Sequence, residues 1–480
     1  MIERYAEVMI NRGEMSALTH WIGSLPHEIT RKRLFLSMGY AWSLITTNQV
    51  DLAQYWLDDA LQSIEQIEKQ KGGAPTLEEA GITDRVGDVD LLEIRGGLAV
   101  CQSILAMMSG DLKLAAEFSQ QATSYLPEVN VWLRSFIALD DTITSVLSGD
   151  LQKAIESSRT TLRIARQANN PLVMIIAACE IAILEWHQGQ LNKAWESLQK
   201  AQYLATGPEG KPHPMSAFID IVKGEVLFER GLLEEASNIM EHGYQEIKSM
   251  WYLGGLGGLT QLARLRQAMG DVSGAQDLIA EAASGALGKD STQWDNTVIA
   301  ALAVRLALQR ADLAEAERWW KKGGLPDFNT PLSIENFPYH IYEYLMISAQ
   351  TRFLLVRGRE TGRTGDLEQA AELLETILPE SERLHRVFGQ IQILILQSMT
   401  QSALGDKGAT ETLLRALALA EPEGYRQVFL DEGTRLVDLL HQCRSAQQES
   451  GSYLPSVAFI DSLLEAIQRM ETGREFEQAH

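Results

Sequence analysis

The sequence predicts an all-α fold, a right-handed solenoid of about nine or ten stacked helix hairpins of ~40 residues each. A recurring phrase carries this prediction: a turn residue, usually Gly before Asp, is followed five residues later by a small residue, usually Ala. Strong copies begin at Gly110, Gly149, Gly189, Gly231 and Gly270, and weaker ones at Asn48, Ala311, Gly365 and Gly405. From Gly110 to Ala311 the steps are 39, 40, 42, 39 and 41 residues. A fixed period in this range is typical of a stack of similar helical units.

Each unit is predicted to be an antiparallel pair of helices. In one copy, the apolar run 171–188 opens with Pro171, which suits the first turn of a helix, and has no later Gly or Pro. Gly189 then ends this helix, because glycine adopts the left-handed backbone without strain. Residues 191–206 follow with apolar or small side chains at helical spacing. Since a hairpin leaves one apolar side uncovered, the next hairpin is expected to pack against it.

Small residues recur at three positions of the unit, seven before the turn residue and five and twelve after it, as at Ala182, Ala194 and Ala201. A bulky residue usually lies nine after the turn, although Ser119 and Ser158 are exceptions. Small side chains let paired helices approach closely, and the bulky ones fill the remaining gaps. This pattern resembles the tetratricopeptide repeat (TPR), lengthened from its usual ~34 residues to about 40.

The spacing divides the chain into three parts. Residues 1–47 are expected to form degenerate helical repeats, residues 48–422 the TPR-like solenoid, and residues 423–480 a C-terminal helical extension. Two longer steps interrupt the period, and they predict loop insertions near 69–90 and 323–337, where polar, Gly- and Pro-containing stretches occur. A further loop is expected over residues 358–365.

The composition excludes several classes of function. A formal net charge of −22 argues against binding to a phosphate backbone by this chain. No apolar run is long enough to span a bilayer, and no signal peptide is visible at the start. Cys101, Cys179 and Cys443 lie far apart inside helical patterns, so we expect buried, reduced thiols in a cytoplasmic protein.

No motif in the chain supports an enzyme, a cofactor site or a metal site. The glycines of 254–258 lack the third glycine of a dinucleotide loop and begin a predicted helix rather than following a strand. No two histidines stand four apart, and no Gly-x-Ser-x-Gly elbow occurs. We therefore expect a protein without catalytic residues.

A binding site is expected where the first helices of successive hairpins line the concave groove. Counting back from each turn residue places nine candidates there: Ile183, Trp186, His187, Glu225, Phe228, Glu229, Arg264, Gln267 and Arg305. Such a mixed polar and aromatic strip suits a protein partner or a small polar ligand, because aromatic faces stack while fixed charges orient. On this interpretation, replacing Arg264 or Arg305 weakens binding and leaves the melting temperature unchanged. The alternative is that these are solvated side chains without a dedicated ligand.

One segment resembles a known family. Residues 416–433, which contain Glu-Pro-Glu-Gly-Tyr and Phe-Leu-Asp-Glu-Gly, resemble the end of the sensor arm in MalT-type bacterial transcription regulators. The match extends over most of the chain, with further likeness at 105–112, 168–173, 206–212 and 319–325. In that family the arm senses an inducer or a regulatory protein, an upstream NTPase module hydrolyses ATP, and a downstream helix-turn-helix binds DNA.

The resemblance implies a non-enzymatic sensing arm whose NTPase and helix-turn-helix modules belong to a longer parent chain. Neither a Gly-x4-Gly-Lys-Ser/Thr loop nor a basic recognition helix occurs within these 480 residues. The opening residues resemble the middle of the family, which favours an excised arm. A stand-alone TPR scaffold that docks partner proteins in a signalling or defence complex stays open as the alternative.

Overall fold

The computed structural model describes residues 8–478 apart from 11, 13, 32, 48, 72–90, 110, 148, 207–211, 248–254, 287–292, 326–339 and 451–452. Within these residues every regular element is helical, and one isolated bridge pairs Thr206 with Pro212. The predicted all-α, TPR-like fold is confirmed. No helix in this described part of the chain is both long and apolar enough to cross a lipid bilayer.

Nine consecutive hairpins make up most of the molecule, after the short helices α2 (Met15–Gly23) and α3 (His27–Arg31). They are α4 (Leu34–Thr46) with α5 (Val50–Lys71), α6 (Leu91–Met108) with α7 (Leu112–Tyr125), α8 (Val131–Leu147) with α9 (Leu151–Gln167), α10 (Pro171–His187) with α11 (Leu191–Leu204), α12 (Ser216–Glu229) with α13 (Leu233–Ile247), α14 (Gly255–Ala268) with α15 (Val272–Ala286), α16 (Gln293–Gln309) with α17 (Leu313–Lys322), α18 (His340–Thr361) with α19 (Thr364–Arg383), and α20 (Val387–Leu404) with α21 (Ala409–Ala420).

The recurring Gly-Asp phrase has two separate structural roles. The glycine takes the left-handed backbone that ends the first helix, for example with φ of 77° at Gly149 and 79° at Gly189. The aspartate then caps the second helix: the Asp150 carboxylate accepts a hydrogen bond from the Lys153 amide at 3.0 Å. Asp111, Asp271 and Asp312 cap α7, α15 and α17 in the same way. The phrase therefore ends one helix and starts the next.

The small-residue positions lie at the contact between paired helices. Ala182, Ala194 and Ala201 are completely or almost completely buried. At the equivalent position of the next unit, a Cβ atom on Gly224 would lie 1.9 Å from Cγ of Met240, so a larger residue would force the Met240 side chain to move. Close helix pairing thus explains why these positions are small.

The prediction of a loop over residues 358–365 is wrong. α18 continues to Thr361 and α19 begins at Thr364, so the turn is only two residues long. Gly362 supplies the left-handed backbone with φ of 70°, and the Arg357 guanidinium donates to the Asp366 carboxylate across the turn at 2.6 and 2.7 Å. The segments 72–90 and 326–339, which hold most of the two expected insertions, lie outside the described residues.

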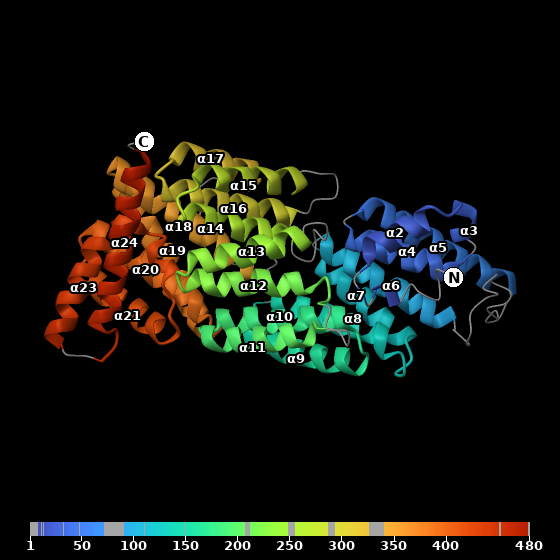
Figure 1. Ribbon diagram of the computed structural model, residues 1–480. Helices are drawn as coiled ribbons and strands as arrows, with labels where there is room; N and C mark the ends of the chain where they lie inside the picture. Colours follow the sequence, from blue (N-terminus) through green and yellow to red (C-terminus); the bar gives the residue numbers. More distant parts are fainter. Residues whose placement is uncertain are drawn as a thin grey trace.

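The last part of the chain returns to the middle of the solenoid. After α21 come the short helices η3 (Glu421–Glu423), α22 (Gln427–Leu430) and η4 (Gly433–Leu436), then α23 (Val437–Ser450) and α24 (Val457–Gln478). α18 packs against α8, α20 against α10, and α22 against α12. Figure 1 shows these C-terminal helices, in orange and red, beside the ends of α12 and α13, at the opposite end from the blue N-terminal hairpins. Hairpins far apart in sequence therefore meet on the inner side.

Candidate binding groove

The nine groove candidates come from four successive first helices. Ile183, Trp186 and His187 lie on α10, Glu225, Phe228 and Glu229 on α12, Arg264 and Gln267 on α14, and Arg305 on α16. These helices contact one another in order, and five of the nine side chains are buried, namely Trp186, Glu225, Phe228, Glu229 and Gln267. Glu229 has no exposed surface, and the side chains of Arg264 and Arg305 are only 11% and 13% exposed. They are therefore not solvated side chains on an open wall.

Part of the chain itself covers this face. Residues 421–436, from η3 to η4, lie across the inner helices, and we call them the groove segment. Its Glu423 carboxylate accepts a hydrogen bond from the Asn192 amide at 2.8 Å, at the start of α11. The Tyr425 hydroxyl donates to the Trp186 backbone oxygen at 2.6 Å. The Arg426 amide donates to the backbone oxygen of Glu229 at 2.8 Å, at the end of α12.

The other end of the groove segment carries adjacent acidic residues that meet a group of arginines. The Asp431 carboxylate pairs with Arg305 at 2.6 Å and with Arg264 at 3.7 Å. Glu432 pairs with Arg352 of α18, and both side chains are buried. The segment thus contacts α10, α12, α14, α16 and α18 in order.

Charges beneath the groove segment are closely coupled. Arg264 pairs with Glu229 at 3.0 Å and lies over the Phe228 ring, 4.7 Å from its centroid. Burial raises the pKa of Glu225 to about 8, although Arg264 opposes this shift. Burial, with the like charge of Arg264, lowers the pKa of Arg305 to about 10, and Asp431 opposes this. The groove therefore holds both charge signs in a poorly hydrated setting.

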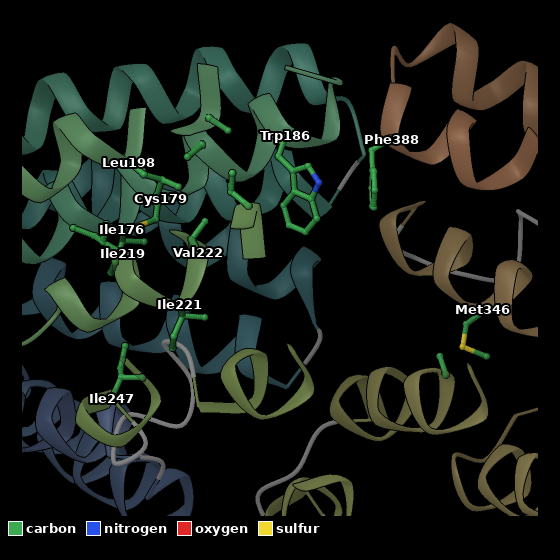
Figure 2. Close-up of a cluster of buried hydrophobic side chains, with 14 of the residues drawn as sticks. Ile176, Cys179, Trp186, Leu198, Ile219, Ile221, Val222, Ile247, Met346 and Phe388 are labelled. Carbon is green, nitrogen blue, oxygen red and sulfur yellow. The ribbon is translucent and has the colours of Figure 1, made fainter. Parts of the chain in front are cut away.

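An aromatic cluster lies at the α10 end of the groove. Trp186 stacks on His187 at 5.0 Å between centroids, and Phe388 of α20 lies 5.3 Å from Trp186 and 5.5 Å from Tyr425. Figure 2 shows the Trp186 and Phe388 rings facing one another from different helices. Burial and the nearby Arg386 lower the pKa of His187 to about 4, so its ring is neutral at neutral pH. His187 consequently serves here as an aromatic packing surface.

Gln267 has a different role from the one expected. Its amide nitrogen donates to the Leu306 backbone oxygen at 2.9 Å, and its side-chain oxygen accepts from Arg310 at 2.6 Å. These bonds join α14 to α16, so Gln267 holds two hairpins together.

The repeat pattern alone does not place Phe388, Tyr425, Asp431, Glu432 or Arg352 in the groove. A signal was present for three of them. Tyr425, Asp431 and Glu432 belong to the Glu-Pro-Glu-Gly-Tyr…Phe-Leu-Asp-Glu-Gly segment, whose acidic and aromatic residues complement the basic and aromatic strip. Nothing in the local pattern marked Phe388 or Arg352, which lie inside ordinary repeat helices.

The structure offers no metal centre in the part of the chain that it describes, since no three His, Cys, Asp or Glu side chains gather there. Cys101, Cys179 and Cys443 are buried and free, as expected for structural thiols. Burial raises the pKa of Cys101 and of Cys443 to about 12, so both carry a proton at neutral pH.

Comparison with known proteins gives a family match over most of the chain. The family model described as the MalT-like TPR region matches residues 96–446. Among solved structures, a Rap protein complexed with Competence and Sporulation Factor is 12% identical over 92% of this chain and 99% of that chain, with a TM-score of 0.40. A human IFIT1 dimer with PPP-AAAA is 14% identical over 81% of this chain and 73% of that chain, with a TM-score of 0.33. These two likenesses are too weak to carry an argument.

Proposed function

Because this chain belongs to the family of MalT-like TPR regions, we propose that it is the non-enzymatic signal-sensing arm of an ATP-dependent transcription regulator. The arm binds an inducer or a regulatory protein in the groove between Trp186 and Arg305. Its NTPase and helix-turn-helix modules belong to a longer parent chain in the cytoplasm. The arm itself does not contact DNA, in keeping with its net charge of −22.

The occupied groove is the observation that carries this proposal. The groove already accepts a polypeptide of short helical turns, the groove segment, through a tyrosine hydrogen bond at one end and paired charges at the other. The first helices of five successive hairpins form this surface. We infer that it is a recognition surface, because its charges and rings are fixed before a ligand arrives. A ligand of similar chemistry would compete with the groove segment.

Polar atoms left without partners indicate what a competitor would offer. Among the described residues, Nε of Arg264, Nε of Arg305 and Nε1 of Trp186 are buried and have no acceptor. Each unmet donor costs about 1–3 kcal/mol. A ligand with several oxygen acceptors, such as a hydroxyl-rich molecule or an acidic peptide, would satisfy donors that the groove segment leaves unmet.

A labelled peptide of residues 421–436 tests whether the groove recognises such segments. The variant Tyr425→Ala/Asp431→Ala weakens the chain's own groove segment at both ends. We expect it to bind the peptide at least about tenfold more tightly than the parent chain, because internal competition is reduced. Fluorescence anisotropy measures the two affinities.

A matched control keeps this test specific. Adding Arg305→Ala to the double variant should weaken peptide binding strongly, since the peptide's Asp431 equivalent loses its closest partner. If the double variant keeps its helical circular dichroism and yet binds no peptide, the groove is a packing surface and the proposal fails.

A further inference from the structure

A polar cavity lies apart from the groove, between α6, α7 and α8. Its volume is about 170 Å³, and none of the groove residues lines it. Four hydroxyl side chains and two carboxyl side chains line it, namely Ser103, Ser119, Thr123, Thr144, Asp140 and Asp141. Ligand pockets for drug-sized molecules are usually about 300–1,000 Å³, so this cavity suits a ligand of only a few heavy atoms.

The cavity has a cause in the repeat pattern. Nine residues after the turn, most other units place a buried bulky residue, such as Leu198, Met240 or Trp320, and Ser158 is the other exception. Here the position is Ser119, which lines the cavity instead of filling it. A small side chain at a position that is large in most units therefore leaves this space open.

Asp140 gives the cavity its chemical character. The residue is 3% exposed, and its Oδ2 atom has no hydrogen-bond partner among the described residues. No Lys or Arg in the described part of the chain forms an ion pair with it, and the neighbouring Asp141 adds a like charge. Burial raises the pKa of Asp140 well above its usual range, while a hydrogen bond from Ser103 opposes that shift. A buried carboxyl without a counter-charge is costly, and a cationic ligand would offset the cost.

We propose that this cavity binds a small primary ammonium compound, whose charged nitrogen pairs with Asp140 and whose remaining N–H groups donate to the surrounding hydroxyls. An ammonium group carries three donors and fits a wall that consists of carboxyl and hydroxyl oxygens. The carbon portion of the ligand extends toward Asp141, which is exposed and marks the opening of the cavity. This site is independent of the groove.

Isothermal titration of the full chain with ethanolamine tests the site. We expect saturable one-site binding at neutral pH. Asp140→Asn should weaken it at least about tenfold, because a charge-assisted hydrogen bond is lost. Ethylene glycol, which has similar size and no charge, should bind at least about tenfold more weakly than ethanolamine to the parent chain.

Ser119→Leu supplies the matched second variant. It introduces the bulky residue that most other units carry, so it should block ethanolamine and leave the helical circular dichroism unchanged. If Asp140→Asn does not fold, Ser119→Leu still tests the proposal, because it fills the same space without removing a charge. Equal binding of ethylene glycol and ethanolamine, unchanged binding in Ser119→Leu, or no binding to the parent chain would each overturn it.

Discussion

The hydroxyl of Tyr425 donates a hydrogen bond to the backbone oxygen of Trp186 at 2.6 Å, although the two residues stand 239 positions apart in the sequence. The acceptor is one of the last carbonyls of α10, and it also accepts a hydrogen bond from the Gly189 amide at 2.9 Å. The phenol therefore completes a helix end from a distant part of the chain, and burial raises its pKa. This bond fixes the groove segment against the solenoid.

Tyr425→Phe tests how much this bond contributes. The change removes one hydroxyl donor, while the Trp186 carbonyl keeps its bond from the Gly189 amide, so the free energy of unfolding should fall by about 0.5–1.5 kcal/mol. Chemical denaturation measures the difference. Tyr453→Phe is the control, because Tyr453 is 94% exposed and its loss should change little. Equal stability of the Tyr425 variant and the parent would mean that the bond contributes nothing net.

For Arg305→Ala, the structure predicts a different effect on stability than the sequence alone does. Because Arg305 is the closer partner of the buried Asp431 carboxylate, the truncation leaves that carboxylate with only Arg264 at 3.7 Å and should destabilise the fold by about 1–3 kcal/mol. The melting temperature should therefore fall, whereas the sequence-based expectation was an unchanged melting temperature.

The double variant Arg305→Ala/Asp431→Ala separates the pair from the packing. It should lose less stability than the sum of the single variants, because no unpaired charge remains. Differential scanning calorimetry on the four proteins gives the coupling. Additive losses would show that the two side chains do not interact energetically.

Ala194→Phe tests the packing register of the repeats. Ala194 lies on α11 and is fully buried in the hairpin that α11 forms with α10. The larger ring should therefore overpack the hairpin and lower the free energy of unfolding by about 1–3 kcal/mol. Gln199→Phe, on an exposed position of the same helix, is the control and should be nearly neutral. Thermal melts of the two variants should differ clearly. If they coincide, the small-residue rule does not describe this hairpin.

The sequence predicted the repeats because their causes are local. Gly189 and Asp150 act within a few residues of their own positions, so a period near 40 residues reveals both the helix ends and the small contacts. The predicted loop over 358–365 was wrong because it also depended on local signals. Gly358 and Gly365 looked like turn residues, whereas Gly362 makes the turn.

The covering of the groove depends on contacts that no local pattern records. Asp431 meets Arg305 across 126 positions, and the sequence pattern does not show which charges pair. Trp186, Glu229 and Arg264, which were selected by counting back from the turns, each contact residues 421–436. The same count could not show that residues 421–436 return to bury them.

Glu225→Gln should change how stability depends on pH. The carboxyl has a pKa near 4.5 when unfolded and about 8 in the fold, because burial and the neighbouring Glu229 and Glu180 outweigh the attraction of Arg264. Between these values the folded chain holds a proton that the unfolded chain releases. The parent should therefore lose stability as pH rises from about 4.5 to about 8, and the loss should level off above that.

Glutamine cannot ionise, so the variant should gain on the parent over this window by an amount on the order of a few kcal/mol, with little difference at the acidic end. Urea denaturation at several pH values measures the gap. Glu234→Gln, at an exposed position on α13, should follow the parent at every pH. If the gap between Glu225→Gln and the parent is the same at the acidic and basic ends, then Arg264 holds Glu225 ionised throughout. In that case the groove contains a permanent ion pair at this position rather than a neutral carboxyl.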